Sequence, residues 1–138
     1  MNCVVCSGYL ALKNDVKTNG IRIPYYKGCR PRDKKCAFLN KKCDLLLNNK
    51  VGFCVECKDF PCESLKHLDK RYRILFQTSF IENLNLIKEN GVTKFLESQK
   101  EKWECPDCGE VVCCYYGICF GCSLQKLKNK KNLYRWKD

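Results

Sequence analysis

Four cysteines near the end of the chain carry the clearest chemistry in this sequence. They form two Cys-x2-Cys pairs that ten residues separate, Cys105/Cys108 and Cys119/Cys122. Each pair turns two sulfurs toward one point, and a hairpin joining the pairs would surround one ion of the size of zinc with four thiolates. The residues between the pairs include VVCCYY, which favours strands, followed by Gly117 at a turn. The spacing therefore predicts a zinc ribbon over residues 103–125.

A zinc ion held by four thiolates has no open coordination position, so such a site is structural rather than catalytic. The chain has one histidine, His67, which any Cys–His pair would have to use. His67 lies in a charged segment with helical character, which favours a surface or interfacial position over metal ligation. We therefore predict no catalytic residues and a protein that is not an enzyme.

The first half of the chain carries enough cysteines for two more four-ligand sites. Grouping them by proximity gives one set of Cys3, Cys6, Cys29 and Cys36, and a second set of Cys43, Cys54, Cys57 and Cys62. Together with the ribbon, these sets predict two to three zinc ions per chain.

Two other uses of these thiols stay open. The spacing Cys54-x2-Cys57-x4-Cys62, with a remote cysteine, could hold an iron–sulfur cluster and make the protein an electron carrier or redox sensor, although ferredoxin spacing is tighter. An exposed Cys-x2-Cys pair could also serve a thiol redox enzyme. Visible absorption separates the first alternative from zinc, and thiol titration of the metal-loaded protein separates the second.

Cys113 and Cys114 are neighbours in the strand-forming segment, so their side chains point to opposite faces and cannot both join the ribbon metal. We expect one to pack inside. For the other, burial as a small apolar group and a free, redox-active thiol both stay open.

Composition indicates a small metal-stapled protein. The chain has 138 residues, of which 14 are cysteine, so staples replace part of a hydrophobic core. The opening residues lack the pattern of a secretory signal, and no apolar run approaches a membrane span. Because Cys-x2-Cys spacing is typical of metal sites, we expect a cytoplasmic protein with no membrane contact rather than a secreted disulfide protein. The formal charge of +11 falls to about +5, from 11 minus 6, if three four-thiolate zinc sites each carry −2.

The elements that must position these cysteines differ along the chain. In the first half we expect a short helix over SGYLALK, a long loop over 14–32, and a helix after Pro61 over ESLKHLDKRYRILF. Because these loops bury little apolar surface, metals are expected to nucleate this half.

The middle of the chain has no cysteine between Cys62 and Cys105 and reads as helical. Ser79 and Glu82 match a capping box, Asn90-Gly91 is a stop signal, and Thr93 can cap a second helix that Trp103 closes. The inward positions predicted by helical spacing are Phe80, Ile81, Leu84, Ile87, Phe95 and Leu96.

The predicted fold is a small α+β, metal-stapled chain with a loop-rich first half, a helical spacer and a two- or three-stranded ribbon followed by a helix. The predicted divisions are a cysteine-rich region at 1–76, the spacer at 77–102, the ribbon at 103–125 and a basic tail at 126–138.

The tail interleaves cations with Tyr134 and Trp136. Basic groups can neutralise phosphates and aromatic rings can stack on unpaired bases, so nucleic acid is one candidate partner. A solvated helix whose leucines pack on the core is the interpretation we favour, which leaves a protein partner as the other candidate. The cations are Lys126, Lys128, Lys130, Lys131, Arg135 and Lys137.

Several motifs in order resemble the small prokaryotic family catalogued as domain of unknown function 3795. They are CVVC, YKGCR, CVECKDFPCESL, SFIENLNLIKENGVTKFLESQKEKW and the closing CPDCG to CFGC, and they span most of the chain from Cys3 to Cys122. The resemblance implies a zinc-binding protein with no established activity. The family often has cysteines where this chain has Tyr26 and Leu39. If those cysteines complete a site in the family, Cys29 and Cys36 form only part of one here.

Overall fold

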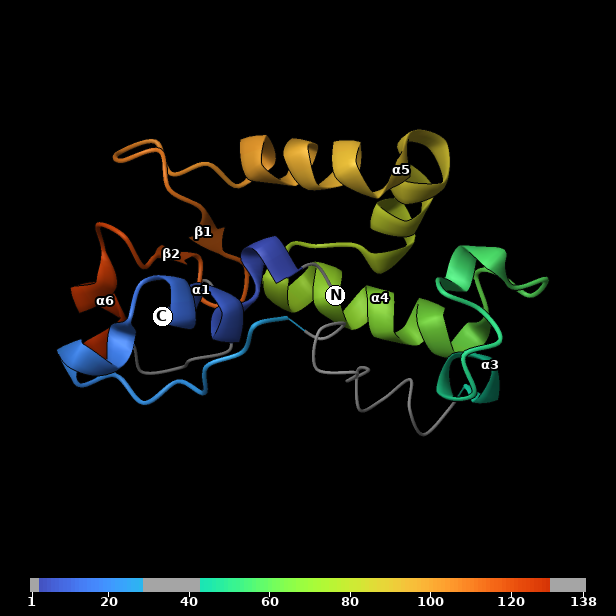
Figure 1. The fold of residues 1–138 in the computed structure, drawn as a ribbon, viewed down its shortest axis with the longest axis horizontal. Coiled ribbons are helices and arrows are strands. Elements are labelled where there is room, and N and C mark those ends of the chain that lie inside the picture. The colour runs from blue at the N-terminus through green and yellow to red at the C-terminus, as the bar shows by residue number, and fades with distance from the viewer. Residues whose placement is uncertain (1–2, 29–42, 130–138) are drawn as a thin grey trace.

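A computed structural model describes residues 3–28 and 43–129 of the chain. Short helices dominate the first part, two long helices the middle, and a hairpin with a final short helix the end (Figure 1). The 3-10 helices are η1 (Cys3–Val5), η2 (Val16–Asn19) and η3 (Cys54–Glu56). The α-helices are α1 (Ser7–Lys13), α3 (Asp44–Leu47), α4 (Glu63–Phe76), α5 (Phe80–Lys102) and α6 (Leu124–Lys128), and the strands are β1 (Val112–Cys113) and β2 (Ile118–Cys119).

The predicted helices are confirmed at α1 and α4, whose bounds match SGYLALK and ESLKHLDKRYRILF. The predicted stop at Asn90-Gly91 is also confirmed, because Gly91 has φ 81° and ψ 168° and breaks α5 into two helical segments at a kink. Only glycine reaches such a conformation without strain. The broad fold class, a mixture of helices and a short sheet, is therefore confirmed.

The start of α5 is capped differently from the prediction. Ser79 Oγ accepts the Glu82 N–H at 3.1 Å, which is one half of the capping box. The same hydroxyl donates to Asp69 Oδ1 at 2.7 Å, and the Ile81 N–H donates to that oxygen at 3.0 Å. Asp69 is only 3% exposed. Since a buried carboxylate must be hydrogen-bonded, this residue of α4 fixes where α5 begins.

A core cluster joins the two long helices. Leu65, Leu68 and Phe80 are its buried members, and Tyr72 and Leu84 pack against it. In Figure 1, α4 and α5 cross the view one above the other, which matches this shared core. The helical middle therefore has a packed apolar face that does not involve the hairpin.

A second core cluster joins the beginning of the chain to its end. Its buried members are Leu10, Ala11, Val16, Ile21, Ile23, Cys113, Tyr116, Phe120 and Leu127. The expectation that the first half buries little apolar surface is wrong for residues 10–23, and part of the predicted 14–32 loop is the 3-10 helix η2. The loop prediction failed because Ile21 and Ile23, which lie between Gly20 and Pro24, pack on a hairpin that is remote in sequence. The predicted domain boundaries stay a prediction.

Aromatic rings connect the two clusters. Tyr115 of the hairpin lies 4.8 Å from Phe76 of α4 between ring centroids, and its hydroxyl is 3.3 Å from that of Tyr72. Aromatic pairs at such distances add about 0.5–1.5 kcal/mol beyond the area they bury. Among the described residues, no helix is long and apolar enough to cross a membrane.

Candidate metal centre

The hairpin is closed by backbone hydrogen bonds on both sides of its turn. Strands β1 and β2 pair antiparallel, with Val112 opposite Cys119 and Cys113 opposite Ile118, and an isolated bridge joins Glu104 to Val111. Gly117 lies in the turn with φ 65°. Because antiparallel pairing brings the two ends of the hairpin together, both Cys-x2-Cys pairs reach the same place.

The four sulfurs of Cys105, Cys108, Cys119 and Cys122 all lie within 4.8 Å of one another. The Sγ–Sγ distances are 3.6 Å for Cys105–Cys122 and 3.6 Å for Cys108–Cys119. A disulfide needs about 2.05 Å, so these are not disulfides. Four thiolates at about 2.3 Å from a central ion stand about 3.8 Å apart at the corners of a tetrahedron. The cluster therefore has the dimensions for one metal ion.

Each pair of cysteines forms the same local structure. Backbone N–H groups of Asp107 and Cys108 donate to the Cys105 sulfur, and those of Cys122 and Gly121 donate to the Cys119 sulfur. Donors two and three residues ahead stabilise a thiolate, and they hold the pKa of Cys105 at about 7, below its ordinary 9.0. Both pairs therefore have the same two backbone donors, which favour the thiolate form that binds metal.

Cys108 and Cys119 resist ionisation when no cation is nearby. The Glu110 N–H lowers the pKa of Cys108, but burial and the neighbouring sulfurs of Cys119, Cys122 and Cys105 outweigh it and raise that pKa to about 12. Burial similarly raises the pKa of Cys119. Four thiolates cannot share this small volume unless a cation compensates their charge, which is the property of a metal site.

Two glycines permit the backbone to turn closely around the cluster. Gly109 has φ 76°, and its N–H donates to the Cys105 carbonyl at 2.9 Å. A Cβ at Gly121 would stand 3.1 Å from Cγ of Glu110 and 3.6 Å from the Cys119 sulfur. Gly109 therefore supplies the positive φ of its turn, and Gly121 leaves space for the side chain of Glu110.

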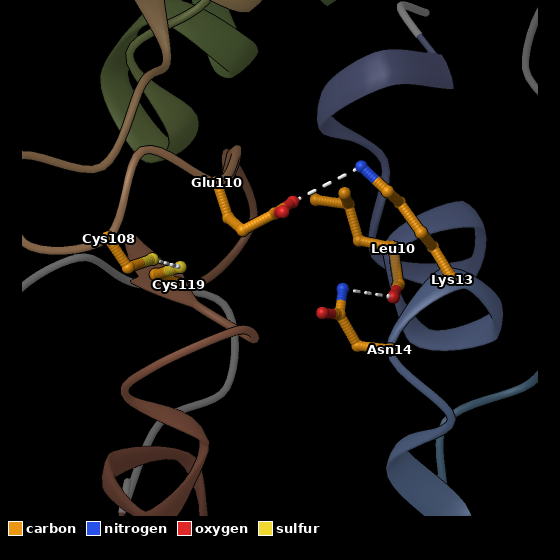
Figure 2. Close-up of polar contacts among 6 residues, drawn as sticks. All are labelled: Leu10, Lys13, Asn14, Cys108, Glu110 and Cys119. Carbon is orange, nitrogen blue, oxygen red and sulfur yellow. Dashed lines mark hydrogen bonds and ion pairs between the residues drawn. The ribbon is translucent and has the colours of Figure 1, made fainter.

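One face of the cluster is open. Cys105 and Cys119 are buried, whereas Cys108 and Cys122 are exposed. Figure 2 shows Cys108 and Cys119 facing each other beside Glu110, whose carboxylate Oε2 lies 3.2 Å from Nζ of Lys13. In the same view the Asn14 side chain donates to the Leu10 carbonyl at 2.8 Å and closes the end of α1. The beginning of the chain thus supports the cluster from one side.

Cys113 and Cys114 are both fully buried. Cys113 lies in the cluster with Leu10, whereas Cys114 packs with Val5 and Trp103 in a third cluster. The predicted opposite orientation is therefore confirmed. Neither residue is in a disulfide, and both thiols are buried, which agrees with the interpretation as small apolar groups. Burial raises the pKa of Cys113 to about 12 and that of Cys114 further. Buried neutral thiols of this kind are unreactive and behave as small apolar groups.

The remaining cysteines are less clearly grouped. Cys43 and Cys62 precede α3 and α4, Cys54 opens η3 and Cys57 follows it, and all four are half-buried. Among the residues described, only the hairpin cysteines lie close enough together to hold an ion. Cys6 precedes α1 and is half-buried. The side chain of Cys3, and Cys29 and Cys36, lie outside the described residues, as do residues 130–138 of the tail.

His67 is exposed on α4, in agreement with a surface position. Tyr26, which stands at a family cysteine position, donates its N–H to the Gly8 carbonyl at 3.1 Å. Its ring lies so close to Gly8 that any side chain there would collide with it. Tyr26 therefore packs on α1.

Sequence reasoning missed the contact between Lys13 and Glu110, which no local signal could reveal because 97 residues separate them. It also missed Gln99, which is 1% exposed on α5. Gln99 is polar, so sequence alone would place it on the surface.

Comparisons with known proteins give no assignment. No family model matches the chain, and no curated protein or solved structure matches it. What the geometry establishes is a cysteine-rich protein with a cluster of four cysteines placed to bind a metal ion.

Proposed function

We propose that the four-cysteine cluster is a zinc ribbon and that the protein is a zinc-stabilised, non-catalytic interaction module of the cytoplasm. The observation that carries this is the pair of 3.6 Å sulfur separations within a group no wider than 4.8 Å. That size suits a single tetrahedral ion, and a four-thiolate site favours zinc over hard cations such as magnesium and calcium. An iron–sulfur cluster would place several irons and sulfides between the cysteines and hold them farther apart.

A structural role follows from the ligand set. Four thiolates fill the tetrahedral shell, so no position is left for water or substrate. Zinc would also supply the positive charge that lets the buried Cys119 and the exposed Cys108 ionise side by side. The ion would then hold together the end of the chain and, through the shared core, residues 10–23.

We propose further metal in the first half, where Cys43, Cys54, Cys57 and Cys62 form one ligand set, and Cys3, Cys6, Cys29 and Cys36 another. Burial raises the pKa of Cys54, and the thiols of Cys43, Cys62 and Cys57 raise it further. The negative charge of a Cys54 thiolate is therefore repelled by these three sulfurs. Their sulfurs are not within single-ion reach, which keeps an iron–sulfur cluster as the alternative for this set.

The partner and the family are also proposals. The resemblance to domain of unknown function 3795 supports a metal-binding role. The basic tail supports either a protein or a nucleic-acid partner, and its residues after 129 lie outside the described part.

Metal analysis of protein purified without oxygen tests the central proposal. We expect two to three zinc ions per chain and no visible absorption. Stoichiometric iron and sulfide, with absorption that is lost on reduction, would reject zinc for the first half. Fewer than one metal ion per chain would reject the ribbon itself.

A further inference from the structure

The outward face of α4 has an unusual composition. The helix buries Leu65, Leu68, Asp69 and Phe76 on one side. At 100° per residue, Ile74 points almost directly away from that side. Its relative exposure is 71%, the highest among the exposed large apolar residues of the described chain. A purely solvated face would carry a polar residue there.

The same face carries two cations that form no ion pair with any residue in the described part of the chain. Lys66 is paired with Glu63 at 2.8 Å, and Arg73 Nε lies 3.2 Å from Asp69. Neither Lys70 nor Arg71 has an ion pair within the described ranges 3–28 and 43–129. The two acids of α4 are therefore committed elsewhere, and two permanent positive charges remain beside Ile74.

These residues surround a shallow hollow. His67, Lys70, Arg71, Ile74 and Leu75 line a space of about 350 Å³ on the surface of α4. We call this group the α4 stripe. Its positions recur at intervals of three and four residues, so they form one continuous strip along the helix.

We propose that the α4 stripe is a docking surface for an acidic amphipathic segment of a partner protein. An apolar side chain of that segment would cover Ile74 and Leu75, and carboxylates on either side would meet Lys70 and Arg71. Arginine can bind a carboxylate through two parallel hydrogen bonds, which would fix the register. This is helix-face recognition, in which apolar contact and charge act together. The inference rests on the proposed interaction role.

The stripe suits nucleic acid less well. Its span from His67 to Ile74 is about 10 Å at 1.5 Å per residue, and two permanent cations neutralise only about two phosphates. It contains no Tyr, Trp or Phe on which a base could stack. The exposed Ile74 side chain would make no favourable contact with a charged phosphate backbone.

Fluorescence anisotropy with the full chain tests the proposal. The probe is a fluorescein-labelled peptide of three Glu-Leu-Leu-Glu repeats, and the control probes replace each Leu by Ser or each Glu by Gln. We expect binding in the micromolar range, on the order of −8 kcal/mol, for the first probe only. Ile74→Ser and the double variant Lys70→Glu/Arg71→Glu should each weaken it about tenfold or more. A matched charge change on exposed residues of α5, Lys100→Glu/Lys102→Glu, should leave it within about twofold.

Three results would overturn the proposal: no binding of the acidic peptide to the unmodified protein, equal weakening by the α5 control, or binding of a labelled single-stranded RNA that the stripe variants abolish. Zinc content and helical circular dichroism are measured on every sample. Full zinc content without peptide binding rejects the stripe alone, whereas absence of zinc rejects the proposed function independently.

Discussion

The four-cysteine hairpin and the segment from Cys43 to Cys62 contain the same number of candidate ligands, yet only one has its sulfurs gathered. In the hairpin, two identical turns are brought together by β1 and β2 and rest on a core cluster. In the other segment, Cys43 and Cys62 stand at the starts of separate helices and only Cys54 and Cys57 share a turn. Cysteine spacing therefore predicts a metal site reliably when paired strands bring two equivalent Cys-x2-Cys turns together. Where the cysteines lie in unlike elements, the spacing alone does not predict which sulfurs meet.

The largest expected effect in this comparison comes from Cys105→Ser. We expect loss of one metal ion per chain and melting of the hairpin, because structural zinc sites contribute about 10–16 kcal/mol of binding free energy in small domains. Helices α4 and α5 should persist, since Leu65, Leu68 and Phe80 lie in a cluster of their own. Zinc content and far-UV circular dichroism measure the two effects.

Asp107→Ser is the matched control for that variant. It changes an exposed side chain in the same turn but keeps the backbone N–H that donates to Cys105. It should retain all zinc. An equal loss of zinc in both variants would mean that the turn, and not the sulfur, is responsible.

Cys57→Ser should have a smaller effect on folding. If Cys57 binds metal, one further ion is lost, but residues 10–23 should stay packed because no residue between 43 and 62 belongs to their core cluster. Amide hydrogen exchange of Leu10 and Val16 should be unchanged while the segment around Cys57 loses protection. Unchanged metal content in this variant would exclude Cys57 as a ligand and widen the contrast between the two regions.

Alkaline pH should lower the stability of the core cluster around the hairpin, because a buried thiol there must ionise. Burial raises the pKa of Cys113 from 9.0 to about 12, so the folded state keeps this thiol neutral. Its contribution to stability is fully present below about pH 9, where the unfolded chain is also protonated, and is lost between pH 9 and about 12. Cys113→Ala should flatten the fall in urea midpoint over this range. A slope identical to that of the unmodified protein would show that other groups cause the loss.

Glu110→Gln should have the smallest effect. The pair with Lys13 is about half-exposed, with side-chain exposures of 52% and 50%, so its loss costs about 0–1 kcal/mol. Zinc content should not change, and the effect on melting should vanish in high salt. A loss of zinc would place Glu110 among the groups that hold the cluster.

Much of the fold was accessible from sequence wherever the signal was local. The pattern of SGYLALK, the stop at Gly91 and the spacing of Cys105, Cys108, Cys119 and Cys122 each depend on neighbours within a few residues. Such patterns can be recognised from the sequence alone because they act through the local geometry of the backbone.

The parts that sequence did not predict depend on contacts between remote segments. Burial of Ile21 and Ile23 requires the surface formed by Tyr116 and Phe120, and the cap of α5 requires Asp69 of the preceding helix. Burial of Cys113 requires the cluster around Leu10, and burial of Cys114 requires Val5 and Trp103. No local pattern encodes these partners.

The union of the chain's beginning with its end bears on synthesis at the ribosome. Leu10, Ala11 and Val16 emerge well before the hairpin and α6 residues that cover them, and Lys13 is synthesised 97 residues ahead of its partner Glu110. At about 5–20 residues per second, these apolar groups stay uncovered for several seconds in each round of translation. The helical pair can form meanwhile, because its core is complete once α5 has left the exit tunnel. A nascent chain of this protein is therefore expected to need its final cysteines, and the metal they capture, before its first helix is protected from aggregation and proteolysis.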